Sequence, residues 1–442
     1  MTSVRRFPPP VPSLTEGVVR PHRDAVTFLT VYVVLLLAIP SQLVFAPLGS
    51  AGSPAQLWGL ALLVWWVLDR AIRARRRASP RIPVRLAMVA FVVCVLISYV
   101  VANVRPIDGV ELRGADRGVL LALSLLGVVL VSIDGIPTMS RFDALLRRLA
   151  VAGGLMAALG ILQYLTKQGF TNYIQIPGLS VNTDIGLLAS RAGVARPAGT
   201  AIHPIEFGAV LTMLLPLALH YALEDSAKGR LRRWLPVVAI AFAIPISISR
   251  SAVLGAAIAL AVLVPTWAVS RRRYFYGVMA AFTVSLYVAL PEVVATLRGA
   301  FLGVSTDSSA LSRTNSYDFA GQLIERSPIL GRGFGTFLPA YRILDNQYLG
   351  VAIELGLVGL VALLTLFIVA MKGARSARAN TDDHALRQQA QAIVAALAAG
   401  ALSFAFFDAF AFPMAACLMF LFVGLSGALL RLTKVAELGS DS

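Results

Sequence analysis

The chain has little charge and few of the residues that build disulfide or metal sites. Of its 442 residues only 14% are charged, with 39 Lys and Arg against 23 Asp and Glu. Soluble proteins average about 25% charged residues, so this chain has too little charge to coat two or three globular domains. It has two cysteines, both inside apolar runs, and four histidines without a His/Cys cluster. These counts argue against a disulfide framework and a structural zinc site.

Long apolar runs take the place of the missing charge. Hydrophobic residues make up 57% of the chain, and the mean hydropathy is +0.76. Runs of this length predict an all-α polytopic integral membrane protein with about twelve transmembrane helices. The predicted spans are residues 25–47, 56–68, 84–102, 118–133, 149–165, 205–223, 234–249, 252–269, 274–290, 347–370, 388–407 and 411–430.

Basic residues set the predicted orientation. Most Lys and Arg lie in short groups beside alternate ends of the spans, as expected for cytoplasmic loops. The net charge of +16 therefore indicates membrane topology and not a nucleic-acid partner. We predict a multi-pass protein with two cytoplasmic tails, 1–24 and 431–442, and one integral membrane domain, 25–430. Two outward loops are long, 166–204 and 291–346, and long loops often carry function.

Three of the arginines on the predicted outer side, against the general bias, stand out. Arg196 precedes the sixth span, Arg250 separates the seventh from the eighth, and Arg313 lies in the large loop 291–346. Guanidinium groups bind phosphate oxygens in a bidentate manner and keep their charge, so together they would suit a diphosphate. Arg191 is a local substitute for Arg196. The alternative is that these arginines meet lipid phosphates.

Several acid–base candidates lie near the same surface. His203, before Pro204, is a candidate base or a helix cap. Asp345, before the tenth span, is either a base for a sugar hydroxyl or the N-cap of that helix. Glu206 and Glu354 lie within predicted spans and need partners or water, and Glu206 is expected to pair with an outward arginine.

A glycine-rich segment precedes the tenth span. The sequence SPILGRGFGTF contains Gly331, Gly333 and Gly335. Such a segment can form a tight turn that brings backbone amides to an anion. Without a preceding strand and a following helix it does not indicate a dinucleotide site.

Residues 191–360 resemble the O-antigen ligase and O-antigen polymerase superfamily of bacterial envelope glycosyltransferases. The shared order runs from Arg196 before the HP pair, through Ser249-Arg250-Ser251, to Arg313. It continues with PILGRGFGTF and then DNQYLGVAIELGLVGL, which contains Asn346, Tyr348 and Glu354. Ligases carry histidine in an HNxYL element where this chain has Asp345, and this departure favours polymerisation over ligation.

The resemblance implies a class C glycosyltransferase fold with a large outer loop between the ninth and tenth spans. It implies a donor glycan on undecaprenyl diphosphate, used at the outer face of the bacterial cytoplasmic membrane without nucleotide sugar, metal or other cofactor. Arg196, Arg250 and Arg313 would hold the diphosphate. A flippase and a chain-length regulator are candidate partners.

Three alternatives remain open at this point. The first is ligation of a finished glycan to lipid A core or another acceptor. The second is a lipid-linked glycan flippase or exporter. A transporter should carry charges along a path to both faces, whereas the informative charges here lie at one surface. The third is a non-catalytic assembly partner with the same scaffold.

Overall fold

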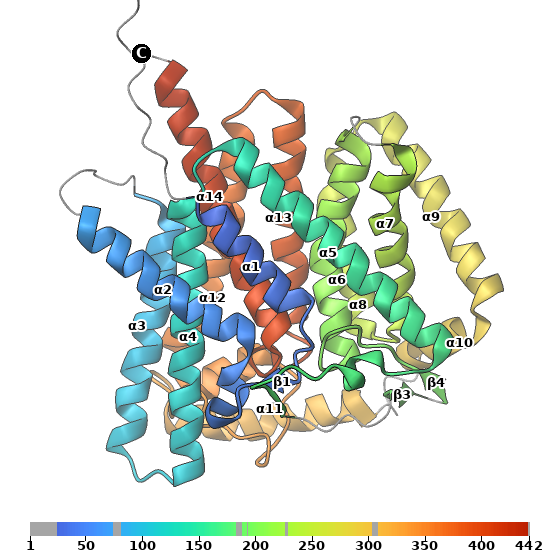
Figure 1. Cartoon of the computed structure of the whole chain (residues 1–442). Coiled ribbons are helices and arrows are strands. Elements are labelled where there is room, and N and C mark those ends of the chain that lie inside the picture. The colour runs from blue at the N-terminus through green and yellow to red at the C-terminus, as the bar shows by residue number, and fades with distance from the viewer. Residues whose placement is uncertain are drawn as a thin grey trace, which may run out of the picture.

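The computed structural model describes residues 24–73, 81–182, 188–191, 193–225, 229–302 and 308–440; of residues 73, 308–315 and 436–440 it describes only the backbone. The all-α membrane class is confirmed. The principal helices, whose arrangement Figure 1 shows, are α1 Ala25–Leu37, α2 Pro54–Arg73, α3 Pro83–Val104, α4 Gly109–Gly135, α5 Met139–Thr166, α6 Pro204–Glu224, α7 Arg230–Ile246, α8 Arg250–Leu263, α9 Val269–Ala289, α10 Pro291–Leu302, α11 Ser308–Arg326, α12 Gln347–Ala379, α13 His384–Ser403 and α14 Pro413–Ser440.

Every predicted span overlaps one helix of the bundle. Seven helices in the described ranges are long and apolar enough to cross a membrane, or eight if α9 and α10 form one bent span. These two helices meet at 106°, with Pro291 at the start of α10. The predicted count of twelve remains a prediction, because α1, α7 and α8 are short and α13 is less apolar than the seven. Helices α10 and α11 occupy much of the predicted outer loop 291–346.

The first predicted span, residues 25–47, is wrong in its second half. Helix α1 ends at Leu37, with Ala38 as its C-cap. Pro40 follows, and a residue before proline disfavours the helical region, so the helix ends ahead of it. The chain then forms a short bridge in which Leu43 of β1 (Leu43–Val44) pairs with Val181 of β2 (Ser180–Val181). This bridge joins the segment after α1 to the outward loop 166–204.

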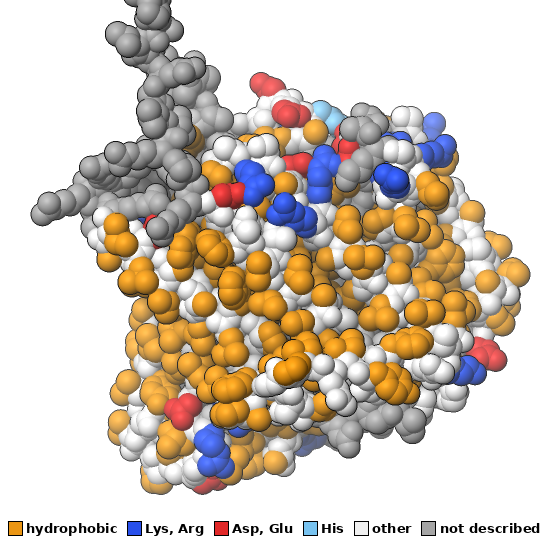
Figure 2. All heavy atoms as spheres, in the orientation of Figure 1, with side chains coloured by type: hydrophobic (Ala, Val, Ile, Leu, Met, Phe, Trp, Pro, Cys, Tyr) orange, Lys and Arg blue, Asp and Glu red, His pale blue; other side chains and the backbone are white. Residues whose placement is uncertain are grey.

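Helices α6 and α14 form the interior of the bundle. In each of them 94% of the apolar membrane-length window is buried, against 22% in α2 and 33% in α3. The outer helices leave large apolar side chains exposed, and Figure 2 shows these as a broad hydrophobic band. Such a band fits lipid contact. The starts of α6 and α14 consequently lie deep within the protein at one end of the bundle.

The two ends of the bundle carry different polar groups. At the upper end of Figure 1, Asp134 at the end of α4 accepts from Arg70 at 2.8 Å and from Arg85. At the lower end, α3, α5 and α7 finish and α4, α6, α8, α12 and α14 begin, with α10 and α11 beside them. The predicted site residues all belong to the lower end or its first helical turns.

Candidate functional site

Arg196 is a buried cation at the lower end. In the sequence, Arg196 directly follows a small hairpin. In this hairpin Arg191 of β3 (Ser190–Arg191) pairs with Val194 of β4 (Val194–Ala195). Arg196 is 9% exposed, and its Nε donates to the carbonyl oxygen of Ser247 at 3.0 Å. Burial, with the nearby charge of Arg191, lowers the pKa of Arg196 to about 10. In the described part of the chain no carboxylate forms an ion pair with it.

The carbonyl that Arg196 binds belongs to a strained turn between α7 and α8. Ile248 in this turn has φ of 47°. A β-branched residue in the left-handed region is a genuine outlier, and such strain concentrates at functional sites. Arg250 begins α8, and its Nη1 donates to the carbonyl of Ala300 in α10 at 2.7 Å. The turn therefore connects the two arginines: its Ser247 carbonyl binds Arg196, and Arg250 at its other end binds α10.

His203 caps α6. Its Nδ1 accepts from the amide of Ile205 at 3.2 Å, as an N-cap side chain does. Burial, reinforced by Arg196, lowers the pKa of His203 to about 4, so the ring is neutral at pH 7. A neutral imidazole that accepts at Nδ1 carries its proton on Nε2. In this arrangement Nε2 of His203 is a hydrogen-bond donor, and the capping alternative describes the residue better than the role of base.

Glu206 does not pair with an outward arginine, contrary to the sequence expectation. Its carboxylate accepts from the amide of Ile202 at 2.9 Å and from the first amides of α14, Met414 at 2.7 Å and Ala415 at 3.2 Å. The first amides of a helix have no partner within the helix, and the positive end of the helix dipole favours a carboxylate. Glu206 therefore joins the starts of α6 and α14.

Asp345 lies directly before α12 but is not its cap, contrary to the capping alternative. Asn346 holds that position and accepts from the amides of Tyr348 at 3.0 Å and Leu349 at 3.4 Å. Asp345 itself has φ of 51°, a conformation that Asp tolerates better than most residues. Asp408, before α14, accepts from the amide of Asn346 at 3.2 Å. Burial raises the pKa of Asp408, and the charge of Asp345 adds to the rise.

Tyr348, the second residue of α12, has a packing role. Its hydroxyl donates to the carbonyl of Ala401 in α13 at 2.6 Å. It fixes the first turn of α12 against the end of α13.

The glycine-rich segment surrounds a carboxylate of the protein itself. Glu354 in α12 accepts from the amide of Phe337 at 3.0 Å, and the amide of Gly335 also donates to it. Its carbonyl accepts from the amide of Gly333 at 2.9 Å. The anion that the amides of Phe337 and Gly335 bind is therefore the carboxylate of Glu354. Gly333, with φ of 122°, belongs to the scaffold.

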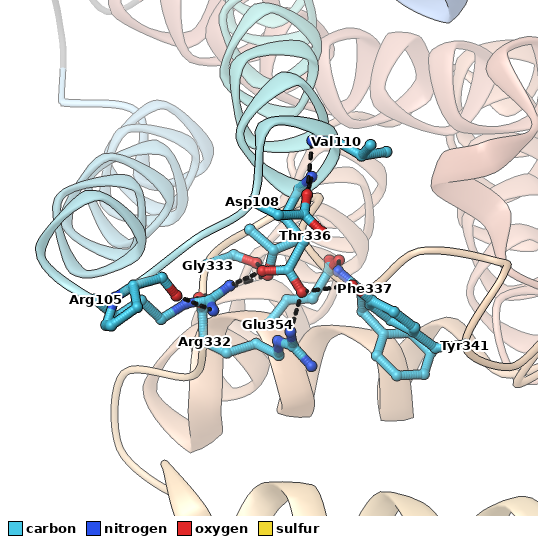
Figure 3. A network of polar contacts seen from close by, with 11 residues as sticks. Arg105, Asp108, Val110, Arg332, Gly333, Thr336, Phe337, Tyr341 and Glu354 are labelled. Atoms are coloured by element: carbon cyan, nitrogen blue, oxygen red, sulfur yellow. Dashed lines mark hydrogen bonds and ion pairs between the residues drawn. The ribbon is translucent and has the colours of Figure 1, made fainter.

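Sequence reasoning missed a polar cluster centred on Glu111 of α4. Glu111 is 5% exposed and forms ion pairs with Arg105 and Arg332. The Tyr341 hydroxyl donates to it at 2.8 Å. Arg105 also donates through Nε to the carbonyl of Arg332 at 2.9 Å, a contact drawn in Figure 3. The one sequence feature that could have pointed to this cluster was Arg332, an arginine of the predicted outer side that lies inside the glycine-rich segment.

Arg313 lies in α11, and its side chain is outside the described residues. Within those residues no group of three or more His, Cys, Asp and Glu is arranged to hold a metal ion. The structure thus brings Arg191, Arg196 and His203 together near the start of α6 and the end of α7. Arg250 starts α8 beside them, and Asp345, Asn346 and Asp408 form a second group at the start of α12.

Comparison with known families finds a match over a region that contains Asp345 and Asn346 but not Asp408. Residues 235–364 match the family model described as O-antigen ligase. The matched region includes Arg250, the glycine-rich segment and the start of α12, while Arg196 and His203 precede it. No curated protein sequence matches the chain. The family match confirms the resemblance to the O-antigen ligase and polymerase superfamily and supports a function of the ligase or polymerase type for this membrane protein.

Proposed function

We propose that the protein polymerises glycan repeat units carried on undecaprenyl diphosphate, at the outer face of the cytoplasmic membrane. The observation that carries the proposal is Arg196, a cation that is almost wholly buried beside Arg191 and bonded to a backbone carbonyl. A buried charge without a carboxylate partner is costly, and an anionic ligand offsets that cost. A diphosphate supplies several oxygens with the geometry that guanidinium groups bind.

The reaction is a single displacement at the anomeric carbon of the donor. An acceptor sugar hydroxyl attacks this carbon, the bond to the diphosphate oxygen breaks, and the lipid diphosphate leaves with its electron pair. Arg196, Arg191 and Arg250 stabilise the charge that grows on the leaving group, and this interaction is strongest in the transition state. Arg313, the third arginine singled out in the sequence, is proposed to bind the same diphosphate.

Asp345 is the base of the proposed reaction. It lies at the start of α12 with its neighbours Asn346 and Asp408 fixed by hydrogen bonds. A carboxylate can accept the hydroxyl proton as the new bond forms. His203 remains the competing candidate, but its Nδ1 already caps α6. We therefore assign His203 the lesser role of a hydrogen-bond donor near the arginines.

The test uses purified protein in lipid nanodiscs with a lipid-diphosphate-linked repeat unit as the sole substrate. A ladder of products that differ by one repeat unit is the expected result, since donor and acceptor are then the same molecule. Arg196→Gln should abolish the ladder, whereas Arg326→Gln, which removes an exposed arginine at the end of α11, should leave it intact. Asp345→Asn should stop transfer and His203→Asn should retain much of it.

Ligation is the second candidate, because the matched family model is described as O-antigen ligase. Unchanged donor in the first assay, followed by transfer once a lipid A core or another acceptor is added, would establish ligation. Movement of intact donor across the membrane without a new glycosidic bond would establish the flippase or exporter alternative. A ladder from wild type that persists at full rate in Arg196→Gln would refute the proposed arginine role.

A further inference from the structure

Helix α12 is broken two residues after Glu354. Gly356 has φ of 67° and ψ of −171°, a conformation open essentially only to glycine. The break separates residues 347–355, which begin at the Asn346 cap, from the longer remainder of the helix. Because a broken helix loses hydrogen bonds across the break, other groups must satisfy the freed amides and carbonyls.

The glycine-rich segment supplies those groups. Beyond the break, the amide of Leu357 donates to the carbonyl of Pro328 at 2.8 Å. Before the break, the carbonyl of Ile353 accepts from the amide of Arg332 at 3.0 Å, and that of Glu354 accepts from Gly333 at 2.9 Å. Residues 328–337 are thus inserted between the two parts of α12. They hold residues 347–355, and with them Asp345, at a fixed place.

The inserted segment is in turn anchored to α3 and α4 through Glu111. The carboxylate binds the side chains of Arg332 and Arg105, while Arg105 binds the backbone of Arg332. Figure 3 shows Arg105, Arg332 and Glu354 close together around this segment. Glu111 is the one carboxylate between the two guanidinium groups among the described side chains. Without its charge the two cations would repel each other across the anchor.

We propose that Glu111 is a positioning residue for glycosyl transfer: it fixes the glycine-rich segment in the break of α12 and thereby sets the place of Asp345. Glu111 acts through Arg332, residues 328–337 and residues 347–355, and it needs no contact with substrate. The inference rests on the proposed function, because it takes Asp345 as the base. It adds a residue from α4, far outside the matched family region, to the catalytic apparatus.

Steady-state transfer by Glu111→Gln tests this assignment. Glutamine preserves the volume of the side chain and removes its charge. We expect kcat to fall at least tenfold while the KM for the donor stays within twofold. The KM should hold because Arg196 and Arg191, which are proposed to bind the diphosphate, are unchanged. The matched control is Asp116→Asn on the same helix, where the exposed carboxylate accepts from Tyr99 at 2.8 Å. That variant should keep the wild-type kcat.

A double variant distinguishes positioning from a general structural role. If Glu111 acts by placing Asp345, the Glu111→Gln change should slow the residual reaction of Asp345→Asn by less than twofold. Effects that multiply in the double variant would overturn the assignment. A full-rate Asp345→Asn variant would instead refute the base of the proposed function, and with it the purpose of the positioning.

Hydrogen exchange gives a second readout that needs no activity. In Glu111→Gln the amides of residues 347–355 should exchange faster than in wild type, while those of α6 keep their protection. Equal acceleration in α6 and α12 would show general loosening of the fold and would also overturn the assignment. Unchanged exchange in both segments together with normal kcat would do the same.

Discussion

Replacing Gly356 by alanine should destabilise the protein by displacing the segment inserted in α12. An added Cβ at this position would lie 2.2 Å from the carbonyl oxygen of Ile329 and 2.7 Å from the amide nitrogen of Gly331. Both are backbone atoms, so the clash cannot be relieved by turning a side chain. The φ of 67° and ψ of −171° would in addition force alanine into a region that is nearly closed to it.

The expected cost follows from these two effects. The backbone conformation costs about 1–3 kcal/mol. Moving residues 328–331 away also breaks the bonds from Leu357 to Pro328 and from Val358 to Ile329, at about 1 kcal/mol each. The free energy of unfolding should therefore fall by about 3–5 kcal/mol, which lowers the equilibrium constant for folding by about a hundred- to a few-thousandfold.

An unfolding titration with sodium dodecyl sulfate, followed by tryptophan fluorescence in mixed micelles, measures this loss. Gly277→Ala is the matched control: it lies in α9, and an added Cβ there meets nothing within 4 Å. Its stability should stay the same or rise by up to about 1 kcal/mol, since alanine favours a helix over glycine. Equal midpoints for the two variants would refute the claim that the inserted segment holds the break.

Two further predictions concern the start of α6. His203 has a pKa of about 4 in the folded protein, below its value of about 6.5 in the unfolded chain. The unfolded state thus binds more protons between these values, and stability should fall by up to about 3 kcal/mol as the pH drops from 6.5 to 4. His203→Asn keeps a capping acceptor without a titrating group, so its titrations at pH 7 and 4.5 should differ less than those of wild type; equal differences would contradict the assignment. Glu206→Ala removes the acceptor of three amides and should cost at least about 3 kcal/mol. Glu206→Gln retains one side-chain oxygen and should cost less, whereas an equal loss in both variants would show that the charge itself is required.

The fold class followed from the sequence because membrane spans depend on long stretches of similar residues. Apolar runs of the required length are visible without any knowledge of packing. Helix ends depend on single residues, and Pro40 after the start of the predicted span 25–47 was outweighed by the hydropathy around it. The bend between α9 and α10 depends in the same way on Pro291, which the averaged pattern placed at the edge of a loop.

The glycine-rich segment was located correctly, but the anion that its amides bind was not identified. Its glycines and the glutamate of the following helix are written 19 or more residues apart, at Gly335 and Glu354. Only the folded chain shows that the amides of one segment are used by the carboxylate of the other. Glu111 is more distant still, 221 residues before Arg332. Nothing in the sequence around Glu111 marks it as a partner of that arginine. Pairings of this kind depend on tertiary contacts that a single sequence does not record.

The structure separates the arginines of the predicted outer side by their partners. Arg105 and Arg332 share the carboxylate of Glu111, so much of their charge is compensated within the protein. Arg196 is bonded to a carbonyl, has Arg191 as its charged neighbour and forms no ion pair with a carboxylate among the residues that the structure describes, so its charge is available to an anion. A diphosphate receptor needs such an uncompensated cation, whereas a scaffold needs the opposite. On the proposed function, the donor diphosphate should therefore bind near the start of α6 and the end of α7, with the sugar directed to Asp345 at the start of α12. Glu111 and its arginines would then act on kcat through the placement of Asp345, whereas Arg196 would act directly on the diphosphate, both when the donor binds and when the diphosphate leaves.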